Sequence, residues 1–300
     1  MRRMPGVAKD EQGDKMRDAA VALLKEWIFR RLDGNTRDWL ANQAVRVAAE
    51  QGNVALHVAF GLVPRRLGKG MLDLTPDEEQ AADRCIEGWK PGTWSLVDAG
   101  RILLLAGLPE KDPDFAPRFR TLCQTADLAE SISLYRGLPL YPVPESLEPQ
   151  VGEGLRTNMR SVFDAIAHHN PYPMRHFDAH RWNHMVLKAL FVGSPLAPIE
   201  GLDARANEEL ARIMRDFAHE RWAAGRQVPH EIWRCVGPFA TGEALDDLDR
   251  VLATGSPLER KAAAMALAAS PDPGAKERLN RLPDLAQDIA SGRLSWATLA

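Results

Sequence analysis

Three histidines in one stretch of the chain have the spacing of side chains that bind a metal or exchange protons. His176, His180 and His184 lie four residues apart within 170–193. We expect 173–192 to form one long helix, which would place the three rings on nearly one face. Two imidazoles four residues apart can bind one zinc ion. His176 and His184 would lie about 12 Å apart along the axis, so the three cannot share it.

Three interpretations of these histidines stay open. The same face continues into Leu187 and Phe191, so we expect the rings to point inward, where each needs a hydrogen-bond partner. They could be structural, contact a ligand, or bind a metal with a third ligand from elsewhere. No Glu stands between either pair, so the HExxH pattern is absent. His176 and His180 are therefore weak metal candidates, His184 is a candidate ligand contact, and we expect no cofactor.

Acid–base chemistry could come from the next expected helix, over 203–224. His219 and Glu220 lie toward its end, and Asp203 is the residue we expect to cap its start. A buried Glu220 beside a histidine would be a plausible general base. An exposed Glu220 would be an ordinary solvated charge, and the sequence leaves both possibilities open.

Basic and amide side chains on neighbouring helices could bind an anion. Arg156, Asn158 and Arg160 follow a Pro-rich stretch, and with Lys188 they could clamp a phosphate or a carboxylate. The alternative is a solvated basic face. The glycine-rich run 61–70 lacks the glycine and the hydroxyl residue that a phosphate-binding P-loop requires.

Composition narrows the class of protein. The 300 residues are 45% hydrophobic and 26% charged with a net charge of -3, which is ordinary for a globular protein and argues against a nucleic-acid partner. The longest apolar run, 102–108, is too short to cross a bilayer. The first residues lack the apolar core of a signal peptide. Three widely spaced cysteines indicate a reducing compartment, so we expect a cytoplasmic protein with no integral membrane segment.

Helical periodicity dominates and no stretch alternates like a strand, which predicts an all-α, irregular multi-helix stack. We predict five parts. They are a flexible tail (1–13), an N-terminal helical part (14–140), a Pro-rich linker (141–150), a central helical core carrying the site (151–235), and HEAT-like helix pairs (236–300).

Several helix ends can be predicted from capping residues. Thr75 and Ser256 each precede a proline and stand three residues before a glutamate, which is typical of a helix start. We expect a helix over 53–63 to stop at the following proline, and single helices over 117–135 and 150–168.

Six stretches of the sequence resemble the EboA family, over roughly residues 20 to 270. They are AFGLVPRRLGK (59–69), GWKPGTWSLVDAGRILLL (88–105), and the segments 122–145, 154–173, 177–193 and 201–226. His180 and His184 depart from the family pattern, which weakens the metal interpretation. The individual positions that match are Asn158, Asn170, Tyr172, Asp178, Trp182, Asn183, Lys188, Asp203, Arg205, Asn207, His219, Glu220, Arg221 and Trp222.

The resemblance implies a place in small-metabolite biosynthesis or export. Proteins of this family accompany a UbiA-type prenyltransferase, a dehydroquinate-synthase-like enzyme, an isomerase-like barrel and a TatD-like hydrolase. It implies no reaction for this chain.

A ligand site would draw on polar and aromatic side chains of the central helices. They are Arg156, Asn158, Asn170, Tyr172, Asp178, Trp182, Asn183, His184, Lys188, Arg205, Asn207 and Trp222.

Two functions follow as hypotheses. The first is an accessory or scaffold protein that holds a small polar metabolite or a partner enzyme of the pathway, with tryptophans such as Trp182 and Trp222 lining a concave surface. The alternative is an enzyme acting on a small polar or phosphorylated metabolite. There, His219 or Glu220 would be the acid–base group, Arg205 and Lys188 the anion clamp, and Asn183 and Asn158 the positioning residues.

Overall fold

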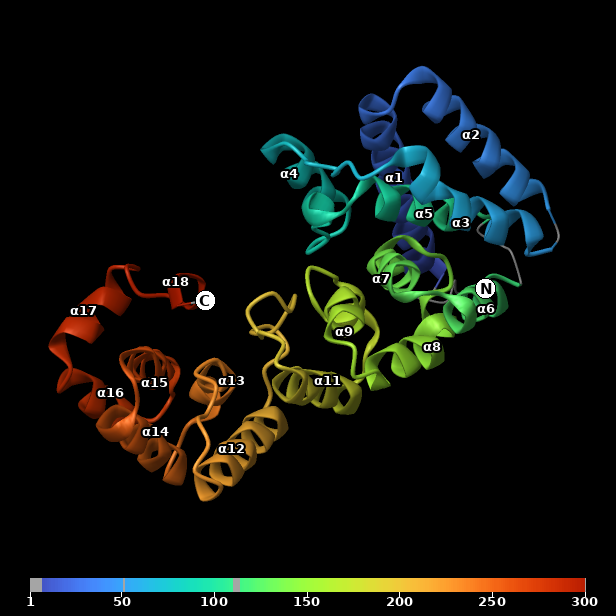
Figure 1. Cartoon of the computed structure of the whole chain (residues 1–300). Coiled ribbons are helices and arrows are strands. Elements are labelled where there is room, and N and C mark those ends of the chain that lie inside the picture. The colour runs from blue at the N-terminus through green and yellow to red at the C-terminus, as the bar shows by residue number, and fades with distance from the viewer. Residues whose placement is uncertain (1–6, 51, 110–113, 300) are drawn as a thin grey trace, which may run out of the picture. The chain divides into compact units, whose positions relative to one another are not determined.

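The structure is a computed structural model that describes residues 7–50, 52–109 and 114–299 (Figure 1). Helices and short 3-10 turns make up its regular structure, and these ranges contain no β-strand. The all-α prediction is therefore confirmed. The chain forms two compact units, Met1–Phe177 (unit 1) and Asp178–Ala300 (unit 2), and each unit is described by itself.

Unit 1 is built around α5, in which every residue except Val97 is buried. Helices α1, α2, α3 and α7 all pack against α5 (Figure 1). The helices of unit 1 are α1 (Val7–Arg31), α2 (Gly34–Ala49), α3 (Val54–Leu67), α4 (Pro76–Cys85), α5 (Leu96–Ala106), α6 (Phe115–Thr125), α7 (Leu128–Arg136), α8 (Pro144–Arg156), α9 (Arg160–Ala167) and α10 (Tyr172–His176), with 3-10 turns η1 (Pro91–Thr93) and η2 (Leu138–Leu140).

Helix α3 continues past Pro64 instead of stopping before it. A proline inside a helix leaves the carbonyl four residues earlier without its donor. Here that carbonyl belongs to Phe60, and the buried Arg101 of α5 donates Nε–H to it at 3.3 Å. The hydrogen bond from α5 replaces the lost one, which is why the helix over 53–63 is longer than predicted.

Two other expected helices are each divided in two. The helix over 117–135 breaks where Asp127 accepts the backbone N–H of Glu130 and starts α7 with a capping box. The helix over 150–168 breaks between α8 and α9. In both cases a cap or an extended residue interrupts a hydrophobic pattern that would otherwise continue. The capping boxes at Thr75 and Ser256 are present as predicted.

The predicted flexible tail (1–13) and the predicted Pro-rich linker (141–150) both overlap helices of the structure. Residues 1–6 of the predicted tail lie outside the described residues, whereas 7–13 begin α1. Most of the predicted linker 141–150 is the first half of α8, which starts with Pro144 at its first position. Tyr141 and Leu147 are buried, so this stretch packs into unit 1.

Unit 2 is built around α15, and four of the six buried residues of this helix are alanines. Helices α13, α14, α16, α17 and α18 pack against it. Small side chains let the backbones approach closely: a Cβ on Gly237 would lie 2.8 Å from the Cα of Ala266. The helices of unit 2 are α11 (Ala179–Val192), α12 (Glu208–Ala223), α13 (Ile232–Val236), α14 (Glu243–Thr254), α15 (Pro257–Ala269), α16 (Pro273–Asn280), α17 (Pro283–Ala290) and α18 (Trp296–Leu299), with 3-10 turn η3 (Gly237–Phe239). The HEAT-like character of 236–300 stays a prediction.

Across the described ranges, no helix combines the length and the apolar character that crossing a bilayer requires.

Candidate functional site

The histidine-rich stretch forms two helices, not one. α10 ends at His176, and α11 begins at Ala179 after Asp178 accepts the backbone N–H of Arg181 at 2.7 Å. Phe177 between them has extended backbone, with φ -80° and ψ 141°. The N-cap signal of Asp178 therefore prevails over the helical pattern. The prediction of a single helix was wrong, and His176 does not share a face with His180 and His184.

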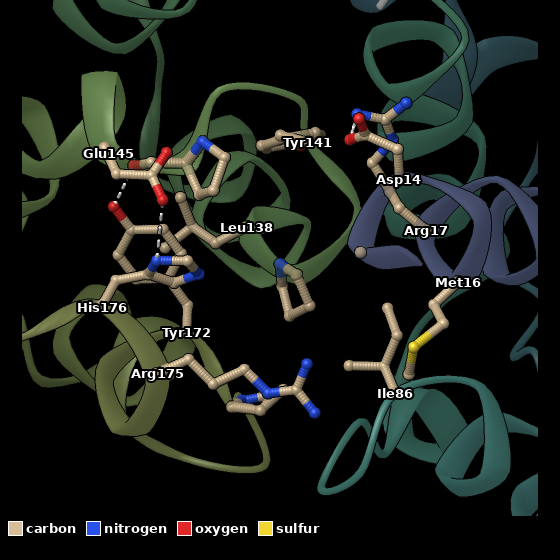
Figure 2. Close-up of a pocket in the computed structure, with 14 residues that line it drawn as sticks. Asp14, Met16, Arg17, Ile86, Leu138, Tyr141, Glu145, Tyr172, Arg175 and His176 are labelled. Atoms are coloured by element: carbon tan, nitrogen blue, oxygen red, sulfur yellow. Dashed lines mark hydrogen bonds and ion pairs between the residues drawn. The ribbon is translucent and has the colours of Figure 1, made fainter. Parts of the chain in front are cut away.

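A cavity of about 260 Å³ lies inside unit 1, next to α10. Its walls come from α1, η2, the start of α8 and α10. Figure 2 shows Glu145, Tyr172 and His176 gathered at one end and Asp14 and Arg17 at the other. The remaining lining residues are Gly13, Met16, Ile86, Leu138, Pro139, Tyr141, Pro144, Pro171 and Arg175.

Asn170 lies behind the wall of this cavity and holds it in place. It is 3% exposed, and its Nδ2 donates to the carbonyls of Tyr135 and Ala165, both at 3.0 Å. Its Oδ1 accepts the backbone N–H of Tyr172 at 3.1 Å. The amide thus ties α7, α9 and the start of α10 together. Asn170, predicted as a ligand contact, is placed as a positioning residue for Tyr172.

Tyr172 and His176 form one end of the cavity. The Tyr172 hydroxyl donates to the carbonyl of Pro144 at 2.6 Å, and its ring centroid lies 4.7 Å from that of His176. His176 Nδ1 lies 3.7 Å from Glu145 Oε1. Burial lowers the pKa of His176, although the Glu145 carboxylate acts in the opposite direction. Burial thus favours the neutral form of His176, which offers a hydrogen bond without a fixed charge.

Arg175 supplies the positive charge of the cavity. Figure 2 shows its guanidinium reaching between the side that carries Tyr172 and the side that carries Ile86. It donates to the backbone carbonyl of Glu87 at 3.3 Å. Arg17, in contrast, is paired with Asp14 at 3.3 Å and Asp18 at 2.9 Å. Arg175 keeps donors available for an anion, because a guanidinium has five N–H groups.

Backbone strain marks two segments that line the cavity. Val143 has a φ of 50° and His169 a φ of 52°, and they are two of the three non-glycine residues with positive φ in the described part of the chain. Val143 immediately precedes Pro144, and His169 lies two residues before Pro171, and both prolines line the cavity. Such conformations cost about 1–3 kcal/mol each and cluster at functional sites.

In unit 2, the predicted amide residues pair with each other. Asn183 and Asn207 exchange side-chain hydrogen bonds of 3.1 and 2.9 Å. Asn207 also accepts the backbone N–H of Leu210 and caps α12. Asp203, which we expected to be this cap, instead pairs with Arg234 at 2.6 and 2.7 Å. These groups join α11 to the start of α12.

Arg205 and Trp182 complete that junction. The Arg205 guanidinium lies 4.8 Å from the centre of the Trp182 ring, which is fully buried. Burial lowers the pKa of Arg205, opposed by the nearby Asp178 carboxylate. Lys188, the other half of the predicted anion clamp, is half-buried on α11, and burial lowers its pKa.

The predicted acid–base pair lies on the exposed side of α12. Glu220 is exposed. The His219 side chain is 55% exposed, and its Nε2 lies 2.8 Å from Asp247, which also pairs with Arg215 at 2.8 Å. The condition for a general base, a buried Glu220, is therefore not met. Trp222 is stacked 5.9 Å from the buried Trp233.

Other predicted site residues also face outward. Arg156 and Asn158 are exposed, as are His180 and His184, whose rings lie 4.3 Å apart. The expectation that these two histidines point inward was wrong. The buried face of α11 is instead formed by Trp182, Asn183, Met185, Val186 and Ala189. Within the described residues, no three His, Cys, Asp or Glu side chains are placed to hold a metal ion.

The sequence interpretation missed most of the cavity. Arg175, Glu145, Tyr141 and Arg17 were not singled out, because segments far apart in the sequence bring them together. One usable signal was present. A single tyrosine stands among prolines in GLPLYPVPE and again in NPYP, and both segments line the cavity.

The structure is that of an all-α protein with a small, partly polar cavity between helices of unit 1. The profile of the family described as metabolite traffic protein EboA matches residues 20–237. The chain belongs to this family. No curated protein and no solved structure matched the chain.

Proposed function

We propose that this protein is an accessory protein that binds a small polar metabolite in the cavity of unit 1, within a pathway of metabolite biosynthesis or export. The family description, metabolite traffic protein, supports a role of this kind. The observation that carries the proposal is the cavity itself. It combines the Arg175 guanidinium, the neutral His176 and the faces of Tyr172 and three prolines.

The cavity fits a compact ligand with one anionic group. Its volume of about 260 Å³ lies just below the range of about 300–1,000 Å³ that is usual for ligand sites. A carboxylate or a phosphate would form a charge-assisted hydrogen bond with Arg175. The apolar part of the ligand would lie against Leu138 and Pro139, and a hydroxyl could reach His176.

Binding without chemical change fits the contacts better than catalysis. A carboxylate becomes a general base near neutral pH when burial raises its pKa, and Glu220 is exposed. His219 is hydrogen-bonded to Asp247 within the Arg215 ion pair. We therefore infer that the protein holds its ligand and passes it to a partner enzyme of the pathway.

We also propose a cytoplasmic location. The three cysteines are free thiols. Burial raises the pKa of Cys123 and of Cys235 to about 12, so both stay protonated at neutral pH and react slowly. Free thiols of this kind fit a reducing compartment.

Native mass spectrometry would test the binding proposal. The full chain is incubated with a small-molecule extract of the source cells, desalted and weighed, and so is Arg175→Ala. We expect the wild type to retain a ligand and Arg175→Ala to retain about tenfold less, which corresponds to the loss of about 1.4 kcal/mol. Arg156→Ala, an exposed arginine of the same unit, is the matched control. Equal retention by Arg175→Ala, or no retained ligand in the wild type, would contradict the proposal.

A further inference from the structure

Helix α3 is apolar on the side that faces outward as well as on the side that faces the core. Its buried residues are Leu56, Ala59, Phe60, Val63 and Leu67, which pack toward α5. Yet Val54 is 70% exposed and Val58 is 52% exposed. The helix contains no acidic residue. Exposed apolar side chains along one side of a helix are normally covered by another element, and within the described residues of unit 1 Val54 and Val58 stay exposed.

The neighbouring helix adds to this exposed surface. Val45 of α2 is 69% exposed, and α2 packs directly against α3 (Figure 1). Of the nine large apolar side chains that are exposed in the described part of the chain, three therefore lie on this one hairpin. We call Val45, Val54 and Val58 the hairpin valines. Single exposed apolar residues are ordinary, but Val54 and Val58 lie one turn apart on the same helix face, and contiguous exposed apolar residues indicate an interaction surface.

The hairpin is held firmly enough to present these side chains. The Glu50 carboxylate accepts the backbone N–H of Ala55 at 2.6 Å, at the start of α3. Arg118 of α6, only 6% exposed, donates to the carbonyls of Glu50 and Gly52. These hydrogen bonds tie Glu50 to the start of α3 and both Glu50 and Gly52 to α6, so a well-packed element displays the valines.

Positive charge accompanies the apolar surface. Arg65 and Arg66 end α3, and both are exposed, as is Lys69 beyond it. Residues 33–69 carry five basic and three acidic side chains in a chain whose net charge is -3. Val54, Val58, Gly61 and Arg65 recur at spacings of four, three and four, so they lie along one face of the helix.

We propose that the α2–α3 hairpin docks on an anionic lipid surface. The hairpin valines would enter the boundary between headgroups and acyl chains, while Arg65, Arg66 and Lys69 would contact the lipid phosphates. The half-buried Trp39, whose ring lies 5.6 Å from the Arg66 guanidinium, is a residue type that favours this boundary. A smooth valine–glycine face with a cationic end fits a charged membrane better than a protein, since protein interfaces centre on large anchoring side chains.

Vesicle co-sedimentation of the full chain would test this docking independently of the cavity. The probes are vesicles of phosphatidylcholine alone and of phosphatidylcholine mixed with phosphatidylglycerol. We expect binding to the mixed vesicles that weakens as salt is raised. The double substitution Val54→Asp with Val58→Asp should weaken binding about tenfold or more. Met159→Asp, at an apolar residue of the same unit that is 52% exposed, should bind like the wild type.

A second variant tests the proposal even if the valine variant does not fold. Arg65→Glu with Lys69→Glu changes only exposed side chains, and it should lose the salt-dependent binding while its circular dichroism stays unchanged. Three results would overturn the proposal: equal binding to neutral vesicles, no binding to mixed vesicles, or unchanged binding by both variants. A halved particle mass for the valine variant would assign the hairpin to self-association and would also overturn it.

Discussion

The two parts of the stretch 170–193, residues 170–177 and residues 178–193, both contain several polar side chains but use them differently. In the first half, Tyr172 is 1% exposed and lines the cavity, and Asn170, which is 3% exposed, holds Tyr172 in place through its backbone N–H. In the second half, α11, the two histidines are exposed and the buried amide of Asn183 pairs with Asn207. A high density of polar residues can therefore have two physical causes: the side chains line a cavity, or they join neighbouring helices.

In the first half, Asn170 forms hydrogen bonds to the surrounding backbone, and the polar side chains next to it remain available to the cavity. Asn170 uses both of its N–H groups and its oxygen within the protein. Arg175 and His176 can therefore present nitrogen atoms to the cavity. In the second half, Asp178 is used as the cap of α11, and Asn183 is paired with Asn207, which itself caps α12. The first half accordingly carries our functional proposal.

The largest expected effect concerns the buried amide of the first half. Asn170→Ala removes three buried hydrogen bonds at once, so we expect a loss of about 3 kcal/mol in the free energy of unfolding. Urea denaturation measures it. Asn158→Ala, at an exposed amide, should change stability by less than about 0.5 kcal/mol. A loss below about 1 kcal/mol for Asn170→Ala would remove its role as the support of the cavity wall.

The amide pair of the second half should matter less. Asn183→Ala should cost about 1.5 kcal/mol, because a reciprocal pair of hydrogen bonds is lost while Asn207 keeps its hydrogen bonds to Arg205 and Leu210. A double-mutant cycle with Asn207→Ala isolates the pair, and we expect a coupling of about 1 kcal/mol. Purely additive losses would show that the two amides stabilise the protein separately and that the pairing is incidental.

A smaller effect should appear as pH dependence at His176. Its folded-state pKa lies below the ordinary value because of burial. The unfolded chain therefore binds the proton first, at about pH 6.5, and the folded state loses stability as pH falls from about 7 toward 5. His176→Gln should reduce this loss of thermal stability. His184→Gln, at an exposed histidine, should leave the loss of thermal stability at low pH unchanged. A smaller loss in His184→Gln than in His176→Gln would contradict the contrast between the two halves.

The smallest effect is expected at the outer histidines. His180→Ala and His184→Ala remove exposed rings that lie 4.3 Å from each other, so each should change stability by less than about 0.5 kcal/mol and leave ligand retention intact. Thermal unfolding and native mass spectrometry measure both. A clear loss of ligand in either variant would move the binding site toward α11.

Local signals in the sequence predicted much of the fold. Periodicity indicated an all-α protein, and Thr75 and Ser256 marked two helix starts correctly. Predictions failed where tertiary contacts decide between local alternatives. Arg101 lets α3 continue through Pro64, and Asp178 caps a new helix within a continuous hydrophobic pattern.

The candidate site was only partly predictable. Tyr172 and His176 were singled out and line the cavity. Arg175 was not, because its importance depends on distant segments, near Arg17 and Ile86, that come together only in the folded unit. Periodicity and local motifs carry no information about such contacts.

Hydrogen–deuterium exchange of the full chain, with and without the ligand retained from the cell extract, tests the central claim most directly. Amide exchange should slow when the ligand is bound, because binding suppresses local opening. Our account predicts protection in 138–145 and 171–177, which line the cavity, and none in 179–192. Protection confined to α11 and α12, with 171–177 unchanged, would contradict it.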